Sequence, residues 1–230
     1  SHAKLWRTAN SGRKTSDAPV CSSCHEPHAI KRPDSAAVRD QVAAQARLAD
    51  ALGIDRWGAV IGGSMGGMHA REWGAGLPDR VERLGILASP PITTADQIAL
   101  NSVQLEAIRI DPRFQGGHYY DSGDGDGPHR GLALARRMAL LNYRSPTELN
   151  LRFQRSWQSG VSPLGHGGRW AVESYLDFHG NRFTRRFDAN SYLTLVEAMN
   201  SHDVGRDRGG VEAALAAVTA CAQFVKGNEA

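Results

Sequence analysis

Hydrophobic positions in this chain of 230 residues follow two alternating patterns. Apolar residues recur every three or four positions over 38–52, which predicts an amphipathic helix that ends at Gly53. Two short apolar runs, 57–61 and 84–88, predict buried strands, and a helical stretch from 65 to about 77 lies between them. This α–β–α–β order predicts an α/β fold, with a mostly parallel sheet and helices on both of its faces.

The pattern changes after residue 90, where helical spacing takes over. Five further helices are predicted, over 95–109, 131–142, 147–157, 169–179 and 189–200. Gly- and Pro-rich connectors separate them, and a last helix and the beginning of a strand are predicted between 211 and 225. A helical block inserted after the first strands is typical either of a lid over an active site or of an ordinary helical subdomain.

We therefore expect four parts along the chain. Residues 1–34 form a polar head, predicted to be disordered, and 35–92 form an α/β core. Residues 93–205 form a helical lid, and 206–230 return toward the core as a truncated segment.

The pattern G-x-S-x-G at 62–66 stands between the first predicted strand and the helix that follows it. This order is that of the nucleophile elbow of α/β-hydrolase-type enzymes, with Ser64 at its apex. A side chain on Gly62 or Gly66 is expected to crowd the neighbouring backbone. The amide N–H of Met65, at the helix N-terminus, would face a developing oxyanion. Without this context the pattern is more typical of an ordinary Gly-rich β–α turn.

Composition and charge narrow the function classes. Hydrophobic residues make up 41% and charged residues 22%, as in ordinary globular proteins. The net charge of +3 is small and its arginines are scattered, which argues against a nucleic-acid partner. No apolar run is long enough for a membrane span, and the first 20 residues lack an apolar leader. Three cysteines without a leader predict free thiols and a cytoplasmic location.

The head carries a second motif, C-x-x-C-H, formed by Cys21, Cys24 and His25. Its spacing is that of a c-type haem attachment, and with His28 it offers four potential zinc ligands. The absence of an export signal argues against haem, and four ligands within eight residues are too close together for a usual zinc site. We therefore predict no bound metal and an unstructured segment with free thiols.

Further motifs accompany the elbow along the chain, at 62–68, 72–73, 95–97, 111–112, 116–120, 131–136, 143–145, 172–176, 186–193 and 201–206. Together they resemble the homoserine O-acetyltransferase family over roughly residues 35–220. The resemblance implies an α/β-hydrolase fold with an inserted helical lid, incomplete here at both ends, and usually a homodimer. It also implies transfer of an acetyl group from acetyl-CoA, as co-substrate and with no further cofactor, to L-homoserine in methionine biosynthesis.

The resemblance assigns roles to four residues. Ser64 would carry the acetyl group in a ping-pong mechanism, and the Met65 N–H would supply one oxyanion donor. Arg136 matches the family arginine that holds the homoserine carboxylate, a group that suits the guanidinium fork. Tyr143 matches a tyrosine near the substrate, and because it lies two helical turns after Arg136 we expect both on one helix face.

The chain departs from the family pattern in its catalytic acid and base. In α/β-hydrolases these follow the serine in the order Asp, His, and in this family they follow strands that would come after residue 225. Five histidines after Ser64 fall in the lid-like block: His118, His129, His166, His179 and His202. Five alternatives remain open: a homoserine O-succinyltransferase, a serine O-acetyltransferase, a plain esterase, a non-catalytic remnant, or a binding module whose head carries metal.

Overall fold

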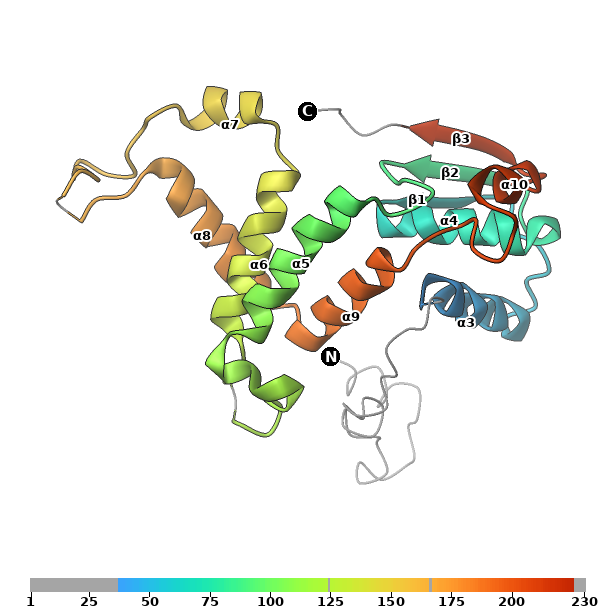
Figure 1. The fold of residues 1–230 in the computed structure, drawn as a ribbon, viewed down its shortest axis with the longest axis horizontal. Coiled ribbons are helices and arrows are strands. Elements are labelled where there is room, and N and C mark those ends of the chain that lie inside the picture. The colour runs from blue at the N-terminus through green and yellow to red at the C-terminus, as the bar shows by residue number, and fades with distance from the viewer. Residues whose placement is uncertain (1–36, 124, 166, 226–230) are drawn as a thin grey trace. The chain divides into compact units, whose positions relative to one another are not determined.

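The computed structural model describes residues 37–123, 125–165 and 167–225 (Figure 1). The chain divides between residues 34 and 35 into two units, and every described residue belongs to the second. The predictions for the head, including Cys21, Cys24, His25 and His28, lie outside the described residues.

Among the described residues, three parallel strands form the sheet: β1 (Val60–Gly63), β2 (Arg83–Leu87) and β3 (Cys221–Val225), in the order β1-β2-β3. Helix α4 (Met65–Gly76) follows β1, the short turn η2 (Pro78–Arg80) precedes β2, and α10 (Val211–Ala216) precedes β3. The parallel sheet predicted from the sequence is confirmed. Strand β1 begins later than predicted, because Trp57 makes only an isolated parallel bridge, to Val81.

Helices cover only one face of this sheet among the described residues. Leu84 and Ile86 of β2 pack against Ala70 and Trp73 of α4, and Val42 joins the same core from α3 (Ala37–Ala51). Figure 1 shows α4 running along that face.

The opposite face carries Ile61, 72% exposed, and Leu87, 40% exposed. The prediction of helices on both faces is therefore wrong for the described part of the chain. That prediction rested on the apolar character of both strands. Apolar strands do not show whether another element covers the second face of the sheet. Strand β2 buries alternate positions only, as expected for a sheet with one covered side.

In the part of the helical block that the structure describes, there are five α-helices. They are α5 (Ala95–Arg109), α6 (His129–Asn142), α7 (Pro146–Phe153), α8 (Ala171–Thr184) and α9 (Ala189–Asn200), with the turn η3 (Pro112–Gly117) after α5. The bounds of α5 and α9 match the predicted ranges. Helix α7 ends four residues early, at a residue (Gln154) with φ of 48°, which a right-handed helix cannot continue through.

This block has a hydrophobic core of its own, formed where α5, α6, α8 and α9 meet. Its buried residues include Leu105, Ile108, Leu132, Ala135, Phe183, Tyr192, Leu193 and Val196. Helix α8 runs on through Gly180 because that glycine packs on α6: a Cβ there would lie 2.8 Å from the carbonyl oxygen of Ala133. None of the described helices is both long and apolar enough to cross a membrane.

The two ends of the block meet at a single joint. The Thr93 N–H donates to the His202 carbonyl oxygen at 3.0 Å, and the Val204 N–H donates to the Pro91 carbonyl oxygen at 3.0 Å. Ile92 and Asp203 form the antiparallel bridge between these two segments. The helical block is thus an insertion that leaves and re-enters the α/β core at one place.

Candidate active site

Ser64 occupies the sharp turn between β1 and α4. Its backbone has φ of 53° and ψ of −120°, a conformation that residues other than glycine rarely adopt. The turn is held because the Ser64 N–H donates to the Leu87 carbonyl oxygen at 3.0 Å, while the Ser64 carbonyl oxygen accepts from the Gly67 N–H at 2.9 Å. Ser64 is the N-cap residue of α4, yet its side chain makes no capping bond and the residue is exposed. The hydroxyl is therefore presented outward rather than used to cap the helix.

The glycines of the turn permit this close approach, but not all as predicted. A Cβ on Gly62 would lie 2.0 Å from the carbonyl oxygen of Gly66, which confirms the prediction for Gly62. The prediction for Gly66 is wrong, because its Cβ would meet no atom within 4 Å outside its own helix. The second crowded position is Gly67, where a Cβ would lie 2.5 Å from the Ser89 Cβ.

Met65 is the first residue of α4. Its backbone N–H stands where a helix offers no acceptor of its own, at the positive end of the helix dipole. This is the position in which a backbone N–H next to a nucleophilic serine could donate to an oxyanion. The oxyanion role of Met65 stays a prediction.

Four of the histidines that the structure describes contact other groups than Ser64, and one of these is His69 of α4, whose Nε2 lies 2.6 Å from the Gln41 Oε1. The His129 ring lies 3.0 Å from the Gly125 carbonyl oxygen, and His179 packs edge-on against Tyr175. His202 is buried beside Glu72, with 3.9 Å between Nδ1 and Oε1. Across 37–123, 125–165 and 167–225, no hydrogen bond links a histidine to the Ser64 hydroxyl. His166 lies outside the described residues.

A buried charge cluster anchors the elbow helix. Glu72 of α4 is 2% exposed and forms ion pairs with Arg208 at 2.8 Å and with Arg39 at 3.5 Å, so it joins α4 to α3 and to the segment that follows α9. Burial and the neighbouring guanidinium of Arg71 lower the pKa of His202 to about 4, so its imidazole is neutral at physiological pH. Sequence reasoning missed this cluster, although residues 72–73 and 201–206 stood among the quoted motifs.

Arg136 and Tyr143 meet at the C-terminal end of α6, as their spacing predicted. The Arg136 guanidinium lies 5.5 Å from the centroid of the Tyr143 ring and 4.9 Å from that of Phe183 on α8. The expectation that both face the same side is confirmed. Within the described residues, no hydrogen bond or ion pair connects this pair to Ser64.

Arg136 also lines a cavity of about 310 Å³ between α6 and α8. The other lining residues are His179, Arg182, Phe183 and Arg186. Phe183 supplies a buried ring, and the remaining four side chains are cationic or can become so. Such a lining suits an anionic ligand.

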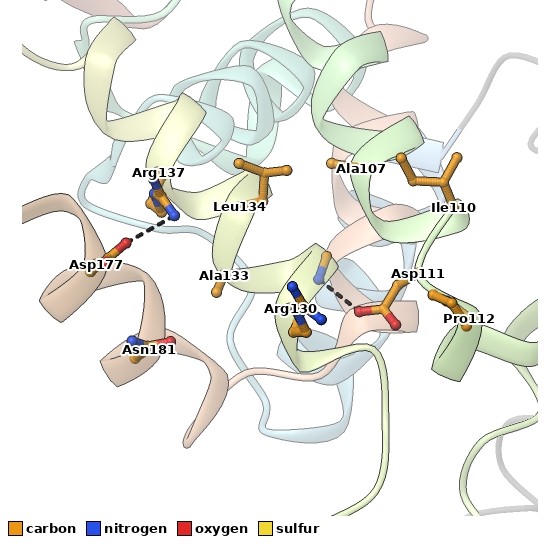
Figure 2. Close-up of a pocket in the computed structure, with 11 residues that line it drawn as sticks. Ala107, Ile110, Asp111, Pro112, Arg130, Ala133, Leu134, Arg137, Asp177 and Asn181 are labelled. Atoms are coloured by element: carbon orange, nitrogen blue, oxygen red, sulfur yellow. Dashed lines mark hydrogen bonds and ion pairs between the residues drawn. The ribbon is translucent and has the colours of Figure 1, made fainter. Parts of the chain in front are cut away.

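A second cavity, of about 540 Å³, opens between α5, α6 and α8 (Figure 2). Its polar contacts hold the helices together: Asp111 accepts from the Gly131 N–H at 2.8 Å, and Arg137 pairs with Asp177 at 2.8 Å. A Cβ on Gly131 would lie 2.4 Å from the Ala107 carbonyl oxygen, so α5 and α6 touch through their backbones. The polar groups that line this cavity therefore serve helix packing.

Two of the motifs quoted for the family resemblance meet in space. The hydroxyls of Tyr119 and Tyr120 both donate to the Asp188 carboxylate, which also caps α9 by accepting from the Ser191 N–H at 2.8 Å. The Asn190 side chain donates to the Gly117 carbonyl oxygen at 2.9 Å. Burial and this carboxylate raise the pKa of Tyr119, so its hydroxyl stays protonated. Residues 116–120 and 186–193 therefore share one hydrogen-bond network, which fixes the start of α9.

The strand–elbow–helix geometry with an exposed serine defines a class of protein. The α/β hydrolase fold family matches residues 10–198, and the chain belongs to this family. The match begins within the head, which lies outside the described residues.

Within that class, the resemblance to homoserine O-acetyltransferases is confirmed. The chain is 74% identical over 188 residues to the homoserine O-acetyltransferase of Clavibacter michiganensis subsp. michiganensis, with 82% of this chain and 48% of that protein covered. It is 55% identical over 183 residues to that of Thermobifida fusca, with 80% and 48% covered. The chain thus spans about half the length of the curated relatives it matches.

Solved structures show the same likeness. The crystal structure of homoserine O-acetyltransferase from Bacillus anthracis matches with a TM-score of 0.74 and 28% identity, over 82% of this chain and 50% of that one. The crystal structure of esterase E22 matches with a TM-score of 0.73 and 27% identity, over 82% and 51%.

Proposed function

We propose that this protein transfers an acetyl group from acetyl-CoA to the hydroxyl of L-homoserine through an ester on Ser64. The observation that carries the proposal is the Ser64 elbow, found in a chain 74% identical over 188 residues to a homoserine O-acetyltransferase. An exposed serine in a strained turn at a helix N-terminus suits nucleophilic acyl transfer.

The reaction has two half-reactions. The Ser64 oxygen attacks the thioester carbonyl, the carbon–sulfur bond breaks, and the serine proton passes through a base to the departing thiolate. The hydroxyl of homoserine then attacks the acetyl-serine carbonyl, and its proton passes back to the Ser64 oxygen as that bond breaks. The Met65 N–H stabilises the oxyanion in both steps. We assign the base to none of the histidines that the structure describes, because none of them bonds to Ser64.

Arg136 and Tyr143 are proposed to hold the acceptor. L-Homoserine carries one carboxylate at neutral pH, and a guanidinium binds such a group through two parallel hydrogen bonds. The Phe183 and Tyr143 rings hold the Arg136 guanidinium at 4.9 and 5.5 Å, which limits its motion before the acceptor binds. A lysine could not reproduce that planar fork.

The proposal includes a cytoplasmic homodimer that works in methionine biosynthesis. Two apolar side chains support an interface on the helical block: Ile110, 66% exposed, and Leu134, 39% exposed, line the same cavity. Sedimentation velocity tests this interface. Leu134→Glu is expected to weaken a dimer, whereas Leu48→Glu, at an exposed leucine on α3, should leave it intact; equal behaviour of both variants contradicts the interface.

The intact mass of the protein before and after acetyl-CoA tests the function. We expect a mass gain of one acetyl group, absent in Ser64→Ala and removed when L-homoserine is added. Absence of the adduct from the unsubstituted protein would overturn the proposal. Succinyl-CoA in place of acetyl-CoA, or L-serine in place of L-homoserine, distinguishes the alternative donors and acceptors.

The likeness to esterase E22 favours a second candidate, hydrolysis of acetyl esters, in which water replaces homoserine in the second half-reaction. The same experiment separates the two functions. A transferase keeps its adduct until homoserine arrives, whereas an esterase loses the adduct in buffer at a rate that homoserine does not change.

A further inference from the structure

The cavity of about 310 Å³ between α6 and α8 has an unusual charge balance. Arg136, Arg182 and Arg186 line it together with His179. No carboxylate is among its lining residues in the described part of the chain. Three guanidinium groups around one small space repel each other, so an anion in that space would be strongly favoured.

The carboxylates of the neighbouring segments are already engaged elsewhere. Their partners are Arg144 and Arg152 for Glu148, Arg137 and Arg169 for Asp177, and Tyr119 and Tyr120 for Asp188. Among the described residues, no ion pair is recorded for the three arginines of the cavity. Their charge is therefore available to a ligand.

The cavity is also preorganised. The guanidinium groups of Arg136 and Arg186 lie 4.9 and 5.7 Å from the centroid of the same ring, that of the buried Phe183. Stacking on a fixed ring limits the rotamers of both side chains, which lowers the entropic cost of binding. Phe183 itself is fixed by the helical core, where it stacks on Phe187 with the ring centroids 4.7 Å apart.

We propose that this cavity binds the phosphate groups of the acyl donor, with Arg182 and Arg186 as the contacts. The inference rests on the proposed function and deepens it. The single carboxylate of homoserine matches one arginine, Arg136, and leaves two without a ligand. The phosphate groups of a coenzyme A thioester carry several negative charges, which suit the remaining guanidinium groups.

Calorimetric titration of the full chain tests the phosphate site without acyl transfer. The probes are coenzyme A, pantetheine, which has the same thiol arm but no phosphate, and inorganic pyrophosphate. The variants are Arg182→Gln and Arg186→Gln, and Arg185→Gln is the matched control, since Arg185 is an exposed arginine of the same segment outside the cavity lining. Thermal melting confirms that each variant is folded.

We expect each cavity variant to weaken coenzyme A binding about tenfold and the control to change it less than about twofold. Binding should also weaken steeply with added salt. Equal affinities in all variants, or equal affinities for coenzyme A and pantetheine, would overturn the proposal. Pyrophosphate binding as tightly as coenzyme A would reduce the cavity to a site for free anions and overturn its assignment to the donor.

The proposed function fails in a different way. If coenzyme A binding depends on Arg182 and Arg186 but acetyl-CoA leaves no adduct on Ser64, the phosphate site stands and the acyl-transfer function does not.

Discussion

The Cβ that Gly62 lacks would lie 2.0 Å from the carbonyl oxygen of Gly66. The end of strand β1 and the first turn of α4 are therefore in direct backbone contact. This contact sets the angle between the strand and the helix at Ser64. Gly66 contributes its backbone to the contact but has free space where its own side chain would be.

Gly62→Ala and Gly66→Ala are therefore expected to differ sharply in stability. The first places a methyl group inside the backbone of α4 and should cost on the order of 3 kcal/mol in the free energy of unfolding. The second adds a methyl group in open space on a helix and should be neutral or stabilise by at most about 1 kcal/mol. Urea titrations of both variants measure this, and a similar loss in both would show that the elbow relaxes freely.

The strained backbone of Ser64 leads to a second prediction. Ser64→Ala and Ser64→Gly both remove the hydroxyl, so neither should form an acetyl adduct. Of the two, only glycine adopts a φ of 53° without a conformational penalty to the stability of the folded chain. Part of this gain in stability is offset by the greater entropy of the unfolded chain that carries the glycine. We expect Ser64→Gly to be more stable than Ser64→Ala by about 1 kcal/mol, as measured by thermal melting with matched far-UV spectra. Equal melting temperatures would mean that the turn stores no strain.

Local signals in the sequence explain why most elements could be predicted. Helix α5 has its predicted bounds because Thr94 and Gln97 form a reciprocal capping box at its start. The elbow was found because strand, glycines and serine lie within one short segment. Helix α8 runs five residues past its predicted end at 179, to Thr184, and Gly180 within it is a contact point with α6.

Non-local features could not be predicted in the same way. Glu72 has partners 33 residues before it and 136 residues after it, so its burial has no local signature. Nothing local in the sequence places Arg182 and Arg186 in one cavity with Arg136, because that requires α6 to lie beside α8. The uncovered face of the sheet could not be predicted either. Ile61 and Leu87 are as apolar as residues of a strand in a sheet that is covered on both faces.

The buried carboxylate of Glu72 supports a third prediction. Glu72→Gln keeps the shape of the side chain but leaves Arg39 and Arg208 facing a neutral amide, which should cost about 2–3 kcal/mol of unfolding free energy. The matched control is Glu82→Gln, whose carboxylate is 45% exposed and pairs with Arg56 and Arg83; its loss should cost less than about 1 kcal/mol. Urea midpoints compare the two, and equal losses would show that the buried cluster adds nothing beyond a surface pair.

His202 makes the stability of this protein depend on pH in a predictable direction. Burial and Arg71 lower the pKa of its imidazole in the folded chain from an ordinary 6.5 to about 4, with Arg39 and His69 acting in the same direction and Asp203 against it. Above pH 6.5 both the folded and unfolded forms are neutral, so the full contribution of His202 to stability is present. Between pH 6.5 and 4 only the unfolded chain takes up the proton, and stability falls by roughly 1.4 kcal/mol per pH unit, about 3 kcal/mol in all.

His202→Asn removes that titration and isolates it from the carboxylates that also respond to acid. The asparagine variant is expected to be less stable than the unsubstituted chain at pH 7.5, because it leaves a smaller side chain beside Glu72. As the pH falls toward 4 the gap between the two should narrow or reverse, since only the unsubstituted chain loses the histidine contribution. Urea midpoints at pH 7.5, 6.0 and 5.0 follow this difference. A gap that stays constant across the range would mean that His202 takes up its proton as readily in the folded chain as in the unfolded one, and that the packing of the joint between 91–93 and 201–204 tolerates a charged imidazole.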